Sequence, residues 1–183
     1  MELGIRRDIY DGRCVTMTNA NWYAVYVKSR HEFVVSGELQ RKGIETFLPS
    51  VTKLNQWKDR KKLVDVPLFP GYLFISIAPD PEEFLRVLKT RGTVTFISLE
   101  PGHPTPVAHE EIRALKILLD AAGKIDVYPL LKQGSRVRIK SGVFRGAEGI
   151  LARKKDHHLL LVSIDLLGRS VGVKIYADDV EAA

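Results

Sequence analysis

Pro67-Leu68-Phe69-Pro70-Gly71-Tyr72-Leu73-Phe74-Ile75 constrains its own backbone strongly and sets the local geometry of this 183-residue chain. Two prolines bracket two large apolar residues, so a helix cannot run through this segment. Pro70 favours an extended Phe69, and Gly71 permits a turn or a close backbone approach. The residues that follow, 72–77, are aromatic and apolar and predict a strand.

This bend presents Leu68, Phe69 and Tyr72 at the start of the predicted strand. A bulky apolar group that prolines hold rigid suits a preformed contact surface, because little conformational entropy is left to lose on binding. The alternative is that all three side chains belong to the core, since large apolar residues are usually inside. The residues alone leave both readings open.

The composition is that of a soluble globular protein, with 45% apolar and 27% charged residues. The net charge of +6 suits a nucleic-acid or ribonucleoprotein partner without requiring one. Cys14 is the only cysteine, so neither an internal disulfide nor a cysteine metal cluster can form. Charged residues interrupt the first twenty positions, and no stretch has the roughly 20 apolar residues that a membrane span needs. We therefore expect a cytoplasmic protein.

The first two thirds of the chain predict alternating strands and helices. Ser29 and Glu32 have the spacing of a capping box and predict the start of a helix that Gly43 ends. The predicted order is a strand at 22–27, this helix, a strand at 44–48, a hairpin with arms at 51–54 and 63–66, a strand at 72–77, a helix from Pro81, a strand at 93–97 and a helix at 110–122. Without the hairpin, this is the split β-α-β-β-α-β order of a ferredoxin-like domain. Two helices are expected to cover one face of the sheet and leave the other free.

The last third of the chain has a different pattern of apolar residues and glycines. Residues 124–133 lack periodicity and are interpreted as a linker. From Gly134, short apolar runs separated by glycines predict a small barrel of four or five strands. The predicted organisation is an N-terminal extension at 1–20, an α+β domain at 21–123, the linker at 124–133 and a barrel at 134–183.

Four segments resemble, in order, the NusG family of transcription elongation factors. Residues 22–26 (WYAVY), 67–74 (PLFPGYLF) and 90–94 (TRGTV) resemble its N-terminal NGN domain, and 134–150 resembles its KOW motif, an SH3-like barrel. Residues 67–74 look closer to the specialised RfaH-like paralogues, whereas the turn at 167–170 looks more like the general factor. The resemblance implies a binding protein without catalysis, which acts as a monomer in transcription elongation and antitermination.

The resemblance also implies site residues. Family members bind the clamp helices of the largest RNA polymerase subunit, and the positions that match this apolar region are Trp22, Tyr23, Leu68, Phe69, Pro70 and Tyr72. Positions that lie near the non-template DNA strand in RfaH-like members are Lys28, Arg30, His31 and Arg91. A solvated basic edge is the alternative for these cations. The His-Thr-Thr element of RfaH-like members is not matched, because Glu83-Phe84-Leu85 stands there.

In the predicted barrel, Phe144 and Ile164 match the region that contacts a small-subunit ribosomal protein or a termination factor. Phe144 also fits the barrel core. The alternative function is a ribosome-associated, RNA-binding KOW protein, because KOW motifs occur in ribosomal proteins too.

Other patterns do not indicate chemistry. Asp156-His157-His158 has no further ligand cluster nearby, so we expect no metal. Paired glutamates at 82–83 and 110–111 are explained by the helix dipole. No catalytic residue and no cofactor is expected. Trp57 beside the basic residues 58–62 fits either a solvated hairpin end or a nucleic-acid contact by base stacking.

Overall fold

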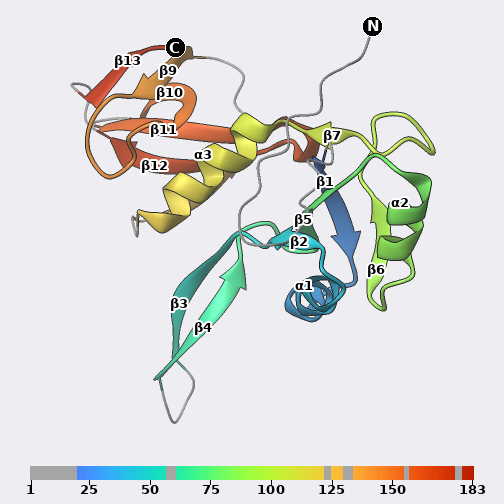
Figure 1. The fold of residues 1–183 in the computed structure, drawn as a ribbon. Coiled ribbons are helices and arrows are strands. Elements are labelled where there is room, and N and C mark those ends of the chain that lie inside the picture. Colours follow the sequence, from blue (N-terminus) through green and yellow to red (C-terminus); the bar gives the residue numbers. More distant parts are fainter. Residues whose placement is uncertain (1–19, 57–60, 122–124, 130–133, 155–156, 176–178) are drawn as a thin grey trace, which may run out of the picture.

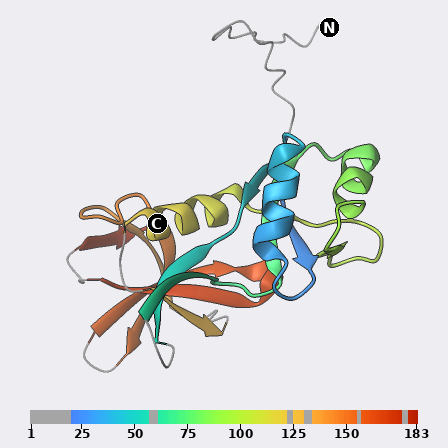
Figure 2. The same cartoon turned by 90° about the horizontal axis from the view of Figure 1, so that it is seen from below.

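The computed structural model describes residues 20–56, 61–121, 125–129, 134–154, 157–175 and 179–183. Predictions for the N-terminal extension, Cys14, the hairpin tip with Trp57, and Asp156 lie outside these residues. The fold is a mixed α/β architecture, with three α-helices and three sheets in the described parts of the chain (Figures 1 and 2). None of the described helices has the length and apolarity that a membrane span requires.

The first sheet, here called the N-terminal sheet, has the strand order β2-β5-β1-β6, with β7 paired to β1. Every pairing in it is antiparallel. With the hairpin set aside, its elements follow the predicted β-α-β-β-α-β order. The bounds are β1 (Asn21–Val27), α1 (Glu32–Arg41), β2 (Glu45–Phe47), β5 (Tyr72–Ile77), α2 (Pro81–Leu88), β6 (Thr93–Phe96) and β7 (Pro106–Val107).

Helices α1 and α2 cover one face of the N-terminal sheet, as expected. Val35 and Leu39 of α1 and Val87 of α2 are fully buried against the strand residues that point to this face. The start of α2 follows from its sequence, because the Asp80 side chain accepts a hydrogen bond from the Glu82 N–H at 2.7 Å and Pro81 occupies the first helical position. Amphipathic packing therefore fixes this layer.

The predicted hairpin is confirmed and forms a two-stranded sheet of its own. Strand β3 (Ser50–Gln56) pairs in antiparallel register with β4 (Lys61–Pro67). Figure 1 shows that this hairpin extends away from the rest of the protein. At its base, the Leu68 N–H donates to the carbonyl of Pro49, the residue before β3, at 2.8 Å, which ties the start of the Pro-rich bend to the start of the hairpin.

The C-terminal sheet is antiparallel and has six strands in the order β13-β9-β10-β11-β12-β8. It includes one strand that the sequence did not predict. Strand β8, inside the segment interpreted as a linker, pairs with β12 from Ile125↔Val173 to Pro129↔Arg169. The bounds are β8 (Ile125–Pro129), β9 (Ser135–Ile139), β10 (Glu148–Lys154), β11 (His157–Ile164), a 3-10 turn η1 (Asp165–Leu167), β12 (Arg169–Ile175) and β13 (Val180–Ala182).

Helix α3 (His109–Asp120) packs on β1 of the N-terminal sheet and on β10 and β11 of the C-terminal sheet. It lies between the two sheets in Figure 1. Its buried Ile112, Leu115 and Leu118 belong to one apolar cluster that also contains residues of both sheets. The Lys116 ammonium lies 4.5 Å from the centre of the Trp22 ring, a cation–π contact on the sheet side. The expectation that this second face of the N-terminal sheet is free is therefore wrong for the part around Trp22, which α3 covers.

Candidate functional site

The six residues predicted to face the polymerase do not form one exposed surface. Four of them are buried: Trp22, Tyr23, Leu68 and Phe69. Pro70 is exposed and Tyr72 is half-buried. The bend therefore has a buried part before Pro70, while Pro70 itself and part of Tyr72 reach solvent.

Tyr23 is separated from Trp22 by the sheet itself. Neighbouring residues of a strand point to opposite faces, so the Tyr23 ring packs on the α1–α2 side, with its centre 5.1 Å from that of Phe84 and 6.1 Å from that of Phe96. Trp22 faces α3 on the other side. A single surface cannot use both rings, and we assign Tyr23 to the core.

Phe69 is fully buried in the structure, which corrects the expectation that it is displayed to solvent. Its ring packs edge-on against Phe74 with 6.2 Å between ring centres, in the cluster that contains Trp22 and Leu68. The physical reason is the covered second face of the sheet: the side chains that the prolines direct there meet an apolar layer, so burial wins over display.

Next to Pro70, two tyrosines reach the surface, one from the bend and one from the neighbouring strand β1. Tyr26 on β1 is directly opposite Tyr72 on β5. Their ring centres are 5.4 Å apart, and 40% of Tyr26 is exposed. Gly71 makes this pair possible, because its φ is +83° and a Cβ there would lie 3.0 Å from the Tyr26 ring. We call Tyr26, Pro70, Gly71 and Tyr72 the aromatic turn. Tyr26 was not predicted to be a site residue, although strand alternation puts Trp22, Ala24 and Tyr26 on the same face of the sheet.

The four cations predicted to contact DNA come together on two adjacent turns. The turn after β1 carries Lys28, Arg30 and His31, and the turn before β6 carries Arg91. These turns are joined because the Lys28 N–H donates to the Gly92 carbonyl at 2.8 Å. Lys28, Arg30 and Arg91 are exposed. We call these two segments the basic turns.

Arg30 has an unusual backbone conformation. It is the one residue other than glycine with a positive φ, +62°, among the described residues. The left-handed region costs an L-residue about 1–2 kcal/mol. Such strain concentrates at functional sites and is held there by surrounding contacts. Here, the His31 N–H donates to the Lys28 carbonyl at 3.0 Å and closes the turn around Arg30.

Glu32 connects the basic turns to the aromatic turn. Its carboxylate is buried and accepts a hydrogen bond from the Gly71 N–H at 2.8 Å. The predicted capping box is wrong, because the residue before α1 is His31 and no side-chain cap is formed. A second link is the Val27 N–H, which donates to the Gly71 carbonyl at 2.8 Å. The aromatic turn and the basic turns therefore lie at one end of the N-terminal sheet.

The two residues predicted to bind a partner through the C-terminal sheet differ in access. Ile164 is fully buried, whereas Phe144 is half-buried and lines a cavity of about 200 Å³. Val143, which was not predicted to be a site residue, lines the same cavity and is 72% exposed. The accessible apolar surface in this region is therefore Val143 with Phe144. A fully buried Ile164 is not available to a partner in this conformation.

Comparison with known proteins identifies the family to which this chain belongs. The model of the family described as "Transcription termination factor nusG" matches residues 20–116. A protein named transcription termination/antitermination protein NusG from Staphylococcus aureus (strain Mu50) is 31% identical over 175 residues, which cover 87% of this chain and 94% of the relative. The protein of the same name from Chlamydia trachomatis serovar D is 28% identical over 172 residues, with 87% and 91% covered. The chain belongs to the NusG family.

A solved structure entitled "Domain interaction in Thermotoga maritima NusG" has a similar fold. It superposes with a TM-score of 0.50 at 23% sequence identity, and the match covers 89% of this chain and 97% of that chain. The two proteins therefore share both the α/β part and the C-terminal part of the fold.

Proposed function

We propose that this NusG-family protein is a transcription termination/antitermination factor that binds RNA polymerase through the aromatic turn and contacts DNA through the basic turns. The observation that carries the proposal is the hydrogen-bonded connection between these surfaces, from Glu32 to Gly71 and from Val27 to Gly71. A protein that bridges a polymerase and the nucleic acid it holds needs two such surfaces at a fixed separation.

The aromatic turn fits an apolar partner. Tyr26 and Tyr72 present ring surface to solvent, and Pro70 and Gly71 fix the backbone between them. Tyrosines in rigid segments are typical binding hot spots, because they bury a large area with few rotatable bonds. The partner proposed from the family is the pair of clamp helices in the largest polymerase subunit. Tyr72 packs against the buried cluster that contains Trp22, Leu68 and Phe69.

The basic turns fit a phosphate backbone. Lys28, Arg30 and Arg91 are solvent-exposed on adjacent turns, and an ion pair with a carboxylate is found for none of them among the described residues. Cations in this state neutralise phosphates and release counterions, so binding weakens steeply with salt. The proposed ligand is the non-template DNA strand.

The C-terminal sheet, proposed to be the KOW barrel, offers Val143 and Phe144 beside a cavity of about 200 Å³ to a protein partner. Lys174 and Asp179 lie at the same cavity and supply both signs of charge at its rim. We propose a small-subunit ribosomal protein or a termination factor as the partner of this surface.

The polymerase contact is tested with Tyr72→Ala and Tyr26→Ala, measured as binding of the full-length protein to RNA polymerase by biolayer interferometry. A hot-spot truncation costs about 2 kcal/mol or more, which is roughly a 30-fold loss of affinity. The matched control is Leu99→Ala, which also truncates an exposed apolar residue but lies outside the aromatic turn. Unchanged affinity for both tyrosine variants contradicts the proposed contact.

The DNA contact is tested separately, with Lys28→Glu and Arg91→Glu combined. Crosslinking to the non-template strand of a paused elongation complex is expected to fall, and its dependence on salt to become shallower. The control with the same change of net charge is the double variant Lys140→Glu and Arg145→Glu, two exposed cations of the C-terminal part. Retained crosslinking in the double variant, together with retained polymerase binding, refutes the DNA role alone.

A further inference from the structure

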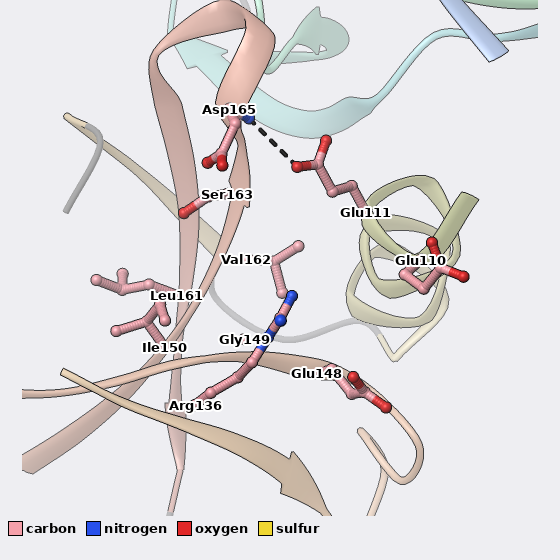
Figure 3. Close-up of a pocket in the computed structure, with 10 residues that line it drawn as sticks. All are labelled: Glu110, Glu111, Arg136, Glu148, Gly149, Ile150, Leu161, Val162, Ser163 and Asp165. Atoms are coloured by element: carbon pink, nitrogen blue, oxygen red, sulfur yellow. Dashed lines mark hydrogen bonds between the residues drawn. The ribbon is translucent and has the colours of Figure 1, made fainter. Parts of the chain in front are cut away.

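A cavity of about 340 Å³ lies between α3 and the C-terminal sheet. Figure 3 shows its lining, in which acidic side chains predominate over a single cation. The charged residues are Glu110 and Glu111 from α3, Arg136 from β9, Glu148 from β10 and Asp165 from η1. The contact between the two sheets of this protein therefore contains several carboxyl groups in a partly enclosed space.

Glu111 makes the polar contact across this cavity. Its side chain projects from α3 toward η1, and its Oε1 accepts a long hydrogen bond, 3.5 Å, from the Asp165 N–H (Figure 3). The buried apolar residues of α3, among them Ile112 and Leu115, belong to the cluster that joins the two parts. Glu111 is thus half-buried at the edge of an apolar contact.

The charges that face Glu111 disfavour its ionisation. Glu110 on its own helix, Glu148 on β10 and Asp165 on η1 are acidic, and Arg136 on β9 is the facing cation. Glu148 is itself engaged by Arg138, whose Nε donates to it at 2.8 Å. Burial, first, and then the charges of Asp165 and Glu110 raise the pKa of Glu111 to about 7, against the lowering effects of the Asp165 N–H and Arg136.

We propose that the contact between α3 and the C-terminal sheet is a proton-sensitive latch, in which neutral Glu111 keeps the sheet docked and ionised Glu111 loosens it. Docking places the carboxyl group in the cavity, and release returns it to water. A neutral carboxyl group loses little in the cavity, whereas a carboxylate there loses hydration and faces three other acidic groups.

The direction of the pH effect follows from the two environments. Glu111 has its ordinary pKa of 4.5 when released and about 7 when docked. Docking is therefore strongest below pH 4.5, weakens as the pH rises from 4.5 to 7, and changes no further above that. The difference of 2.5 pKa units limits the change in the docking constant to roughly 300-fold. The real change is smaller, because the carboxyl group is partly solvated.

Release has a consequence for the partner surface, and this step rests on the proposed function. Ile164 directly precedes Asp165 and is fully buried in the shared apolar cluster. Because this cluster also includes Leu115 and Leu118 of α3, release of the sheet from α3 is expected to make Ile164 more accessible to a partner. The latch therefore couples the protonation of Glu111 to the availability of this residue.

The latch is tested in the full-length protein with no polymerase or partner present, so its failure is distinct from failure of the proposed function. Cys14, the only cysteine, is replaced by serine, and fluorophores are attached at Thr95→Cys and Lys174→Cys, both exposed and on different sheets. Energy transfer is followed during urea titration from pH 5 to pH 8. The urea midpoint for loss of transfer is expected to fall up to about pH 7 and then level off.

Glu111→Gln is the decisive variant, because its amide oxygen still accepts from the Asp165 N–H but cannot ionise. Its midpoint is expected to be independent of pH and to equal that of the acidic wild type. Glu110→Gln is the matched change in the same cavity: it leaves Glu111 able to ionise but removes one charge that raises its pKa, so a smaller pH dependence of the same direction is expected. Circular dichroism over the same titration separates release from unfolding. A wild-type midpoint that is flat with pH, or the same pH dependence in Glu111→Gln, overturns the proposal.

Discussion

The carboxylate of Glu32 accepts a hydrogen bond from the backbone N–H of Gly71 at 2.8 Å, so the first turn of α1 holds the aromatic turn across a distance of 39 residues in sequence. Both groups are buried. A buried donor that loses its partner costs about 1–3 kcal/mol. Glu32 is therefore a positioning residue for two surfaces at once, through a contact that the capping-box spacing did not indicate.

Replacing Glu32 by alanine is expected to lower the free energy of unfolding by about 1–3 kcal/mol, because the Gly71 N–H is left unsatisfied. Glu32→Gln keeps an acceptor oxygen of similar reach and is expected to retain most of the stability. Urea unfolding followed by circular dichroism measures both. Equal losses in the two variants show that the charge, and not the acceptor, is what matters.

Phe69→Ala is expected to destabilise the fold by about 3–5 kcal/mol, because a fully buried ring is replaced by a cavity. This reverses the sequence-based expectation of an exposed anchor whose loss leaves the fold intact. Thermal unfolding measures the effect, and Tyr72→Ala is the comparison, since a half-buried ring at the surface loses less burial. A small loss for Phe69→Ala, with weakened polymerase binding, restores the earlier interpretation.

Arg30 allows backbone strain to be separated from charge. Glycine at this position relieves a left-handed strain of about 1–2 kcal/mol and adds an entropic cost of about 0.5–1 kcal/mol. Arg30→Gly is therefore expected to leave stability unchanged or to raise it by up to about 1.5 kcal/mol, while Arg30→Ala keeps the strain. Both variants lose the guanidinium and are expected to reduce DNA crosslinking equally. A stability for Arg30→Gly below that of Arg30→Ala excludes strain at this residue.

Gly149 is needed for close strand packing. A Cβ there would collide with the backbone carbonyl of Leu161 on the neighbouring strand β11. Gly149→Ala is expected to destabilise the C-terminal sheet by about 1–3 kcal/mol. Gly37→Ala is the matched change in an open helical position with no atom within 4 Å of the added methyl, and there alanine is expected to stabilise by about 0.5–1 kcal/mol. Denaturant titrations of both variants show whether the free energy of unfolding falls for Gly149→Ala and rises for Gly37→Ala.

Local elements could be predicted well from the sequence. The strands at β1, β5 and β6, the start of α2 at Pro81 and the hairpin between β3 and β4 all form where proline, glycine and apolar patterns indicated. The short strand β7 was missed, since two residues carry no periodic signal. Strand β8 was missed because its pairing with β12 depends on residues 40 to 48 positions away in sequence.

Packing between elements was the part that local patterns did not reveal. The exposure of Phe69 was predicted from proline rigidity, but its burial depends on which layer covers the second face of the sheet. The grouping of Tyr23 with Trp22 in one surface was avoidable from the sequence, because neighbouring residues of a strand point to opposite faces of its sheet. The four basic residues were found through family resemblance, and their convergence depends on the contact between Lys28 and Gly92.

The pairing of β8 with β12 also limits how far the C-terminal half can travel. Helix α3 ends at Asp120 and β8 begins at Ile125, and a fully extended chain covers at most about 18 Å over those five steps. While β8 stays paired with β12, this short connection limits how far the C-terminal sheet can move from α3. A partner that moves the C-terminal sheet farther from α3 must first break the pairing of β8 with β12 at the sheet edge. A larger separation from α3 is therefore incompatible with an intact six-stranded sheet.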